Sequence, residues 1–167
     1  MILVSLGTHE RPFLRLAKEV ERLIQEGKIN EEVIVQTGYT KYQIKGAQCH
    51  DFIEFEKMQE YLRDCRMLIT HSGVGSIVSG LELGKPVIAV PRRQQLNEHS
   101  DDHQMQITKK MADNGMVIPV YEISELWEAI KKAEKMPHVE RHAERSPVYG
   151  IVEKKLEEWA AQKQGMK

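Results

Sequence analysis

The chain has 167 residues, 41% of them hydrophobic and 29% charged, which is enough to bury one sizeable core. Its formal net charge of −1 excludes a global basic field of the kind that holds nucleic acid or an anionic membrane surface. No stretch approaches the ~20 apolar residues of a membrane span, and two cysteines suit a cytoplasmic protein with reduced thiols better than a disulfide framework.

In the first half of the chain, short apolar runs alternate with helical patterns. Residues 2–6 are predicted as a strand that stops at Gly7 and Thr8, and apolar residues then recur at helical spacing from Pro12 to Gly27. The next expected elements are strands over 33–36 and 51–55 (DFIEF), a small helix over 58–63 and a buried strand over 67–70.

The second half continues the alternation. The elements expected there are a helix over 75–83, a strand over 87–90, a polar loop over 91–104 (PRRQQLNEHSDDHQ), a helix that ends at 114–115 and a strand over 116–120. Ser124 is the predicted N-cap of a helix that runs through Ala133. Residues 136–147 are predicted as a linker, and residues 148–162 as a charged terminal helix.

Continuous apolar strands that alternate with amphipathic helices indicate a parallel sheet covered on both faces. Short connections and right-handed crossovers then favour a doubly wound arrangement. The pattern therefore predicts an α/β fold, a single Rossmann-like domain over residues 1–135 with its parallel sheet flanked by helices.

A glycine loop, HSGVGS over residues 71–76, lies between a predicted strand and a predicted helix. In an open parallel sheet, ligands bind beyond the carboxyl ends of the strands, and free N–H groups at a helix N-terminus bind phosphate. Gly73 and Gly75 would let an anion approach the backbone. The side chains that would add donors are those of His71, Ser72 and Ser76. The alternative is a tight turn whose glycines only permit close packing, as is expected of Gly80 and Gly84.

Two common phosphate-binding motifs do not fit this loop. A P-loop requires Gly-Lys-Ser/Thr after four intervening residues, and the sequence lacks it. A dinucleotide site requires a third glycine and an acid after the next strand, but Val78 stands at the glycine position and Pro91, Arg92 and Arg93 follow that strand. A flavodoxin-like dinucleotide protein therefore ranks last among the interpretations.

The segment THSGVGSIVSGLELGKPVIAVP, followed by EHSDDHQ, resembles the donor-binding half of GT-B glycosyltransferases. The likeness is strongest to the soluble subunits of two-component bacterial exopolysaccharide and capsule glycosyltransferases and of the eukaryotic dolichol-linked GlcNAc transferase. The peptidoglycan GlcNAc transferase is a more distant likeness. GTHERPF and QTGYTKY extend the resemblance over roughly residues 1–135. It implies a UDP-sugar-binding subunit of an inverting enzyme that transfers a hexose to a lipid-linked acceptor in polysaccharide or glycolipid synthesis.

The resemblance also implies site residues, position by position. Those placed around the nucleotide diphosphate are Gly7, Thr8, His9, Gly38, His71, Ser72, Gly73, Gly75 and Ser76. Those placed at the donor sugar are Glu98, Asp102, His103 and Gln104. The alternative for Asp102 is a first-turn acid that complements the helix dipole. Many relatives carry a ribose-binding acid where this chain has Ser79, so ribose is either bound more weakly here or bound by Glu82, one turn later.

His9 is a candidate general base by its position, although it can equally line the first helix turn without chemistry. No cofactor and no metal are expected, since the resembled family is metal-independent. His99 and His103 have a spacing that suits one metal but lack a third ligand. Arg92 and Arg93 are expected near the donor or on a partner surface.

One Rossmann-like half of a GT-B enzyme lacks an acceptor site. The resemblance therefore implies a membrane-anchored acceptor-binding subunit as partner, which would recruit this cytoplasmic chain to the inner face of the membrane. Neither nucleic acid nor direct membrane insertion is expected. The predicted docking surfaces are the rim around His9, Arg92 and Arg93, and the terminal helix over 148–162. The alternative function is a non-catalytic nucleotide-sugar-binding module.

Overall fold

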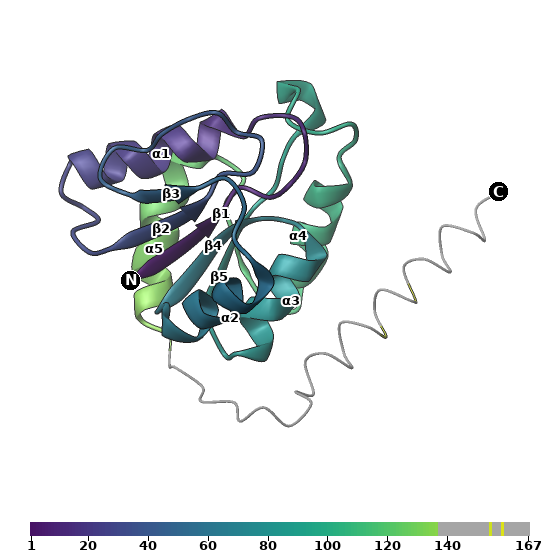
Figure 1. Ribbon diagram of the computed structural model, residues 1–167. Helices are drawn as coiled ribbons and strands as arrows, with labels where there is room; N and C mark the ends of the chain where they lie inside the picture. The colour runs from purple at the N-terminus through teal and green to yellow at the C-terminus, as the bar shows by residue number, and fades with distance from the viewer. Residues whose placement is uncertain (137–153, 155–157, 159–167) are drawn as a thin grey trace.

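The computed structural model describes residues 1–136, 154 and 158 (Figure 1). Its sheet has six parallel strands in the order β3-β2-β1-β4-β5-β6. The strands are β1 (Ile2–Ser5), β2 (Val33–Gln36), β3 (Gln48–His50), β4 (Met67–His71), β5 (Val87–Val90) and β6 (Ile118–Pro119). The helices are α1 (Leu14–Gln25), α2 (Phe55–Asp64), α3 (Val74–Glu82), α4 (His103–Asp113) and α5 (Leu126–Glu134), and short 3-10 turns cover Gln94–Leu96 and Ile123–Glu125. The predicted α/β fold with a parallel sheet is confirmed.

Helices cover both faces of the sheet, and the side chains of each strand alternate between them. Ile2 and Val4 face a core formed with α1 and α5, whereas Leu3 faces a second core formed with α2, α3 and α4. All four residues of β1 are buried, because helices cover both faces of the sheet. This burial explains the unbroken apolar runs of the sequence. Figure 1 shows α1 and α5 on one side of the sheet and α2, α3 and α4 on the other.

The order in which strands are added to the sheet reverses between β1 and β4, although all strands stay parallel. From β1 the chain adds β2 and β3 on one side, then crosses to β4 and adds β5 and β6 on the other. Ser5 pairs with Thr70, so the carboxyl ends of β1 and β4 lie next to each other. The turn after β1 and the glycine loop after β4 therefore meet at the switch point, which is the ligand-binding crevice of open α/β sheets.

The third predicted strand is wrong in position. Residues 51–55 were expected to be the strand, but Gln48–His50 pairs with β2 and Phe55 begins α2. Phe52 and Phe55 are 54% and 75% exposed, so their apolar character does not come from burial in the sheet. Gln48 and His50 of this edge strand are exposed and polar, so the sequence has no apolar pattern there that predicts a strand.

The end of the described chain differs from the prediction in two places. Only Ile118 and Pro119 pair with β5, so the edge strand is shorter than the predicted 116–120. The proposed cap Ser124 lies within a 3-10 turn, and α5 starts at Leu126 with Glu125 as N-cap and no side-chain cap hydrogen bond. Most of the predicted linker and of the terminal helix over 148–162 falls outside the described residues. Among the residues that the structure describes, no helix is long and apolar enough to cross a membrane.

Candidate functional site

The amino end of α3 presents backbone donors at the carboxyl edge of the sheet. Gly73 is its N-cap with an extended backbone, and no side chain caps the helix. The Ile77 N–H donates to the Gly73 carbonyl (3.1 Å), so the N–H groups of residues 74–76 have no acceptor within the helix. These donors, with the positive end of the helix dipole behind them, are able to bind an anion.

Gly75 lies beside open space. A Cβ atom built at Gly75 meets no atom within 4 Å, whereas one at Gly80 would lie 2.8 Å from Val87 Cγ2 and 2.9 Å from Leu68 Cδ2. Gly80 is therefore a packing glycine, and packing does not explain Gly75. The missing side chain at Gly75 leaves the first turn of α3 accessible from solvent, as approach of a phosphate to the backbone requires.

The other glycines of the site make room for the ring of His71. A Cβ atom at Gly7 would lie 2.8 Å from three ring atoms of His71, and one at Gly73 would overlap its Nε2. Gly38, which has a φ of +56°, approaches Gly7 so closely that a side chain there would overlap the Gly7 carbonyl. The structure thus brings the turn after β1, the turn after β2 and the glycine loop together around one imidazole.

His71 is neutral in this setting. Burial, and next the positive charge of Arg92, lower the pKa of His71 to about 4, although a hydrogen bond with the Ser5 backbone opposes the shift. Its Nδ1 lies 3.2 Å from the Thr70 hydroxyl. A neutral imidazole has one N–H, and the hydrogen bond that opposes the shift donates it to the Ser5 backbone, so at neutral pH His71 contributes neither a positive charge nor a second donor.

Ser72 is turned inward, away from the open side of the loop. Its side chain is fully buried, and its hydroxyl hydrogen-bonds the hydroxyl of Thr108 on α4. Thr108 also donates to the Gln104 carbonyl at 2.8 Å. Ser72 therefore fixes the loop against α4, whereas the partly exposed Ser76 lies on the open side with Gly75.

Two of the four predicted sugar residues are buried in the β5–α4 connection. Both carboxylate oxygens of Glu98 accept hydrogen bonds, from Arg15 at 2.9 and 3.0 Å and from the Arg93 N–H at 3.0 Å. The side-chain oxygen of Gln104 accepts from the Arg92 N–H at 3.0 Å. Gln104 thus keeps only its amide nitrogen for a ligand, and the sugar-contact roles of both residues stay predictions.

The other two predicted sugar residues, Asp102 and His103, are exposed. Asp102 is the N-cap residue of α4, and its Oδ1 accepts from the Gln94 N–H at 3.0 Å. The backbone N–H of His103 donates to Asp101 Oδ1 at 2.9 Å. These contacts order the start of α4 and leave the His103 ring on the surface of the molecule.

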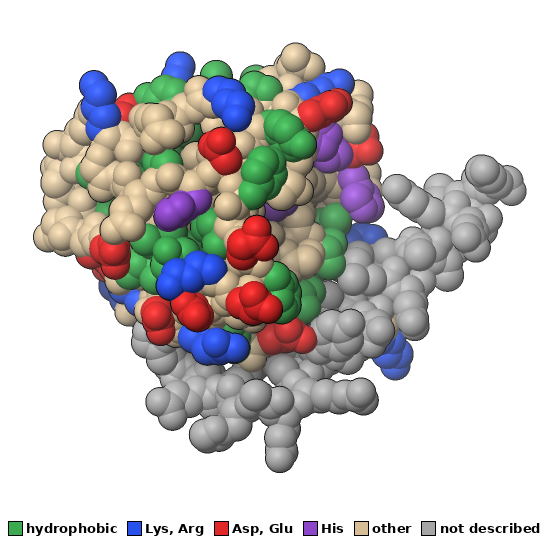
Figure 2. Space-filling model, viewed as in Figure 1, with side chains coloured by type: hydrophobic (Ala, Val, Ile, Leu, Met, Phe, Trp, Pro, Cys, Tyr) green, Lys and Arg blue, Asp and Glu red, His purple; other side chains and the backbone are tan. Residues whose placement is uncertain are grey.

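His9 lies opposite the glycine loop and pairs with another histidine. The ring centroids of His9 and His99 are 4.6 Å apart, and His9 Nδ1 accepts from the Arg11 N–H at 3.1 Å. Burial, followed by the charges of His99 and Arg92, lowers the pKa of His9. Figure 2 shows histidine side chains gathered at the upper right of this face, over the loops that precede α1 and α4.

The spacing of His99 and His103 has no matching third ligand among the described residues. His99 turns toward Asp101, with 3.2 Å between Nδ1 and Oδ1, and toward the His9 ring. Within residues 1–136 and the two described tail positions, no group of three or more His, Cys, Asp or Glu side chains is arranged to hold a metal ion.

Arg92 corrects the predicted docking surface. It was expected on an exposed rim with Arg93, but its side chain is 0% exposed. Its guanidinium donates to carbonyl oxygens of Leu6, Arg11 and Glu98 at 2.6, 2.7 and 2.9 Å. This role could not be predicted from the sequence, because an arginine at the end of an apolar strand is normally solvated in the following loop.

A cavity of about 390 Å³ opens beside the glycine loop, between α2 and α3. Phe55 and Met58 line it from α2, and Gly75, Ser76 and Ser79 line it from α3. The Ser79 hydroxyl donates to the Gly75 carbonyl at 2.9 Å, within the first turns of α3. The cavity thus continues the anion site at the amino end of α3 with apolar walls, as a ligand with a phosphate and an uncharged remainder would require.

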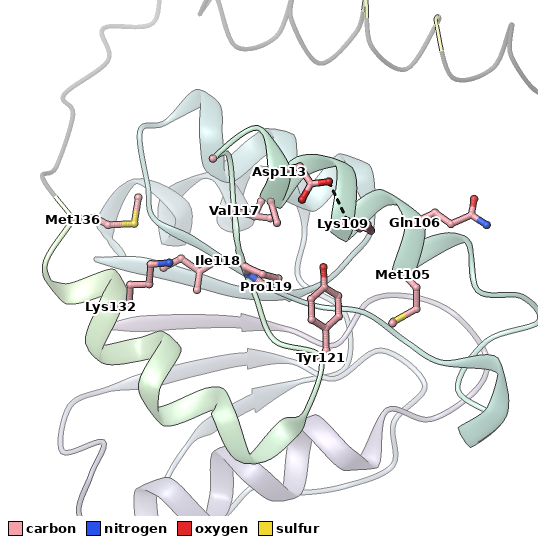
Figure 3. Close-up of a pocket in the computed structure, with 12 residues that line it drawn as sticks. Met105, Gln106, Lys109, Asp113, Val117, Ile118, Pro119, Tyr121, Lys132 and Met136 are labelled. Carbon is pink, nitrogen blue, oxygen red and sulfur yellow. Dashed lines mark hydrogen bonds and ion pairs between the residues drawn. The ribbon is translucent and has the colours of Figure 1, made fainter.

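A larger cavity of about 770 Å³ lies at the β6 edge of the sheet, between α4 and α5 (Figure 3). Met105, Ile118, Tyr121 and Met136 line it, and Lys109 on its rim pairs with Asp113 at 3.3 Å. None of the site residues predicted from the sequence lines this cavity, and it includes neither the glycine loop nor the uncapped end of α3. We therefore place the candidate site at the smaller cavity.

Comparisons with known proteins bear on the family and the fold of this chain. The family model described as "Glycosyltransferase family 28 C-terminal domain" matches residues 1–158, and a comparison with curated proteins gave no match. The kitacinnamycin glycotransferase is 18% identical with a TM-score of 0.60, over 81% of this chain and 35% of that one. The calicheamicin glycosyltransferase CalG4 is 15% identical with a TM-score of 0.59, over 81% and 34%. SnogD from Streptomyces nogalater, also a glycosyltransferase, is 18% identical with a TM-score of 0.57, over 80% and 34%. The chain shares their fold and spans about a third of their length.

Proposed function

Because this chain belongs to the glycosyltransferase family 28 C-terminal domain family, we propose that it is the UDP-sugar-binding subunit of a two-component inverting glycosyltransferase. The observation that carries the proposal is the open space over Gly75 at an uncapped helix N-terminus. That helix end lies at the switch point of the sheet, where nucleotide-binding folds hold their ligands. Family membership makes the ligand class a nucleotide sugar.

The proposed mechanism uses fixed donors in place of a metal. When the bond from the sugar to the diphosphate breaks, negative charge grows on the departing UDP. The N–H groups of residues 74–76 and the α3 dipole would stabilise this charge without reorganisation, which is electrostatic catalysis of the oxyanion-hole type.

The uncharged parts of the donor would extend on either side of the diphosphate. The cavity of about 390 Å³ beside Gly75 supports a position for the nucleoside between α2 and α3. The start of α4, with exposed His103 and the amide nitrogen of Gln104, supports a position for the sugar. In this arrangement Ser79, which lines the cavity, is next to the ribose.

The acceptor half is proposed to come from another polypeptide. The support is the resemblance of this sequence to the soluble subunits of two-component glycosyltransferases, together with a described core that is one Rossmann-like unit. We propose a membrane-anchored partner that binds a lipid-linked acceptor and brings this subunit to the inner face of the membrane. The partner would also supply the general base, unless His9 does.

The direct test is transfer of labelled hexose from UDP-hexose to a lipid-linked acceptor, with and without the candidate partner. We expect transfer only when both proteins are present. Calorimetry with UDP, in EDTA and then in magnesium, should give the same affinity in both. UDP binding without transfer in the presence of the partner would favour a non-catalytic nucleotide-sugar-binding module, and absence of UDP binding would contradict the proposal.

A further inference from the structure

Arg92 is a buried cation without a counter-ion. It is the largest of the fully buried side chains, and in the described part of the chain it makes no ion pair. The acid of the same loop, Glu98, instead binds Arg15 and the backbone N–H of Arg93. Burial of an unpaired charge is unfavourable, and it lowers the pKa of Arg92 to about 10. Stability alone would favour an apolar residue at this position.

Backbone carbonyl groups hold the Arg92 guanidinium in place. Nη2 donates to Leu6, and Nη1 donates to Arg11 and Glu98. The guanidinium also lies 4.8 Å from the centre of the Phe13 ring, while its buried Nε–H finds no acceptor among the described residues. Because these carbonyls belong to the β1–α1 turn and the β5–α4 loop, Arg92 connects both loops beneath the site.

One peptide group, between Leu6 and Gly7, links Arg92 to the candidate site. The Leu6 carbonyl and the Gly7 N–H belong to the same trans peptide, so they point in opposite directions. Arg92 holds the carbonyl at 2.6 Å, and the Gly7 N–H therefore points away from Arg92. A hydrogen bond from a cation polarises the peptide and strengthens its N–H as a donor.

We propose that Arg92 is a positioning residue of the diphosphate site, and that its fixed positive charge stabilises the bound diphosphate from behind the β1–α1 turn. This inference rests on the proposed function, because the anion is the diphosphate of the donor. A bound diphosphate at the end of α3 provides the negative charge that Arg92 lacks.

The neighbouring titratable groups already respond to this charge. Arg92 is the second cause, after burial, of the lowered pKa of His71, and it acts on the pKa of His9 together with His99. The carboxylate of Glu98 is the charge that acts on Arg92 itself. An anion bound between His71 and the Gly7 turn is therefore within reach of the Arg92 field.

The test compares Arg92→Met with Arg93→Met. Both variants lose one positive charge from adjacent residues, but the Arg93 guanidinium binds the Tyr121 carbonyl and the Glu122 carboxylate, the latter at 3.0 Å. NMR titration of His71 in the ligand-free protein and calorimetry with UDP and uridine give the readouts. We expect Arg92→Met to raise the pKa of His71 and to weaken UDP binding about tenfold or more, with uridine binding nearly unchanged. Arg93→Met should change neither.

Two results would overturn the inference. One is an Arg92→Met protein with the wild-type His71 titration and UDP affinity, and the other is an equal loss for UDP and uridine. If Arg92→Met does not fold, Arg92→Lys decides, because it keeps the positive charge. Retained UDP binding with an unchanged His71 titration would support the role of Arg92. Weaker binding of UDP, with uridine binding unchanged, would contradict it. Failure of the wild type to bind UDP would count against the proposed function, whereas the His71 titration tests the Arg92 charge independently of any ligand.

Discussion

Gly75 and Gly80 lie five residues apart on α3 and have opposite surroundings. Gly80 faces Leu68 and Val87 of the sheet at distances that leave no room for a methyl group, whereas Gly75 faces open space. The sequence alone left both glycines open to a packing role. At the scale of single residues, the difference between them separates the open surface of α3, where we propose binding, from its packing surface.

Gly75→Val should therefore weaken UDP binding without destabilising the fold. The new methyl groups would occupy the approach to the N–H groups of residues 74–76, and we expect a loss of at least ~1.4 kcal/mol, which is tenfold in affinity. Calorimetry and thermal denaturation measure the two effects. Gly80→Ala is the control with the reverse expectation. The UDP affinity of the folded protein should stay the same, and the free energy of unfolding should fall by about 1–3 kcal/mol through overpacking. Normal UDP binding by Gly75→Val would make the loop a structural turn only.

His71 should make stability depend on pH in a defined direction. Its pKa is 6.5 in the unfolded chain and about 4 in the folded protein, so between these values only the unfolded chain binds the proton. The free energy of unfolding should therefore be highest above pH 6.5 and fall as the pH drops toward 4, by an amount on the order of 3 kcal/mol at most. The lowered pKa of His9 acts in the same direction.

Urea denaturation between about pH 5 and pH 7 measures this dependence above the range in which carboxylates titrate. His71→Gln should flatten the profile, while His50→Gln, at an exposed position on β3, should leave it unchanged. Parallel profiles for the wild type and His71→Gln would contradict the assignment.

At the scale of elements, the glycine loop depends on α4 for its shape. The buried hydroxyls of Ser72 and Thr108 form the connection, and Thr108 is bonded further to the Gln104 carbonyl. Thr108→Val keeps the shape of the side chain but leaves the Ser72 hydroxyl buried without this partner. We expect a loss of about 1–3 kcal/mol in the free energy of unfolding.

A double-mutant cycle tests this connection. Ser72→Ala combined with Thr108→Val removes both hydroxyls, so the pair should cost less than the sum of the single changes. Denaturant titration of the four proteins gives the coupling energy. Additive losses would mean that the two hydroxyls act independently.

The sequence predicted the central elements well and the edges poorly. The strands over 33–36 and 87–90 have the predicted bounds, because both faces of a central strand are apolar. The edge strand Gln48–His50 was missed because half of its surface meets water. Resemblance predicted which loops form the candidate site, but it could not show that Ser72, Glu98 and Arg92 are buried, since burial depends on contacts with distant segments.

At the scale of the whole molecule, the proposed function makes the described domain one side of a cleft. The carboxyl ends of its strands and the loops around His9 and Gly75 form the surface that a second Rossmann-like half would face. Contacts between such halves typically bury about 600–1,500 Å², which is the size of reversible interfaces. Assembly of the proposed enzyme should therefore depend on concentration.

Transferase activity of the mixed subunits should fall more steeply than linearly when both are diluted together, because the fraction of assembled enzyme falls as well. Activity measured over a dilution series at fixed substrate concentration checks this expectation. A version with both subunits joined by a flexible linker should remove the extra loss, since the linker keeps the partner at a high effective concentration. Activity strictly proportional to concentration in the unlinked mixture would contradict reversible assembly.

The two-residue strand β6 has a consequence for self-association. Val120 donates to the Ala89 carbonyl, so the neighbouring position, Pro119, directs its backbone nitrogen away from β5 toward the free side of the sheet. Proline has no N–H, and a strand arriving from another copy would find no donor there. An open sheet is a template for fibril growth wherever its last strand can pair again. Pro119 hinders that route at this edge, so we expect the domain to resist edge-to-edge pairing through β6.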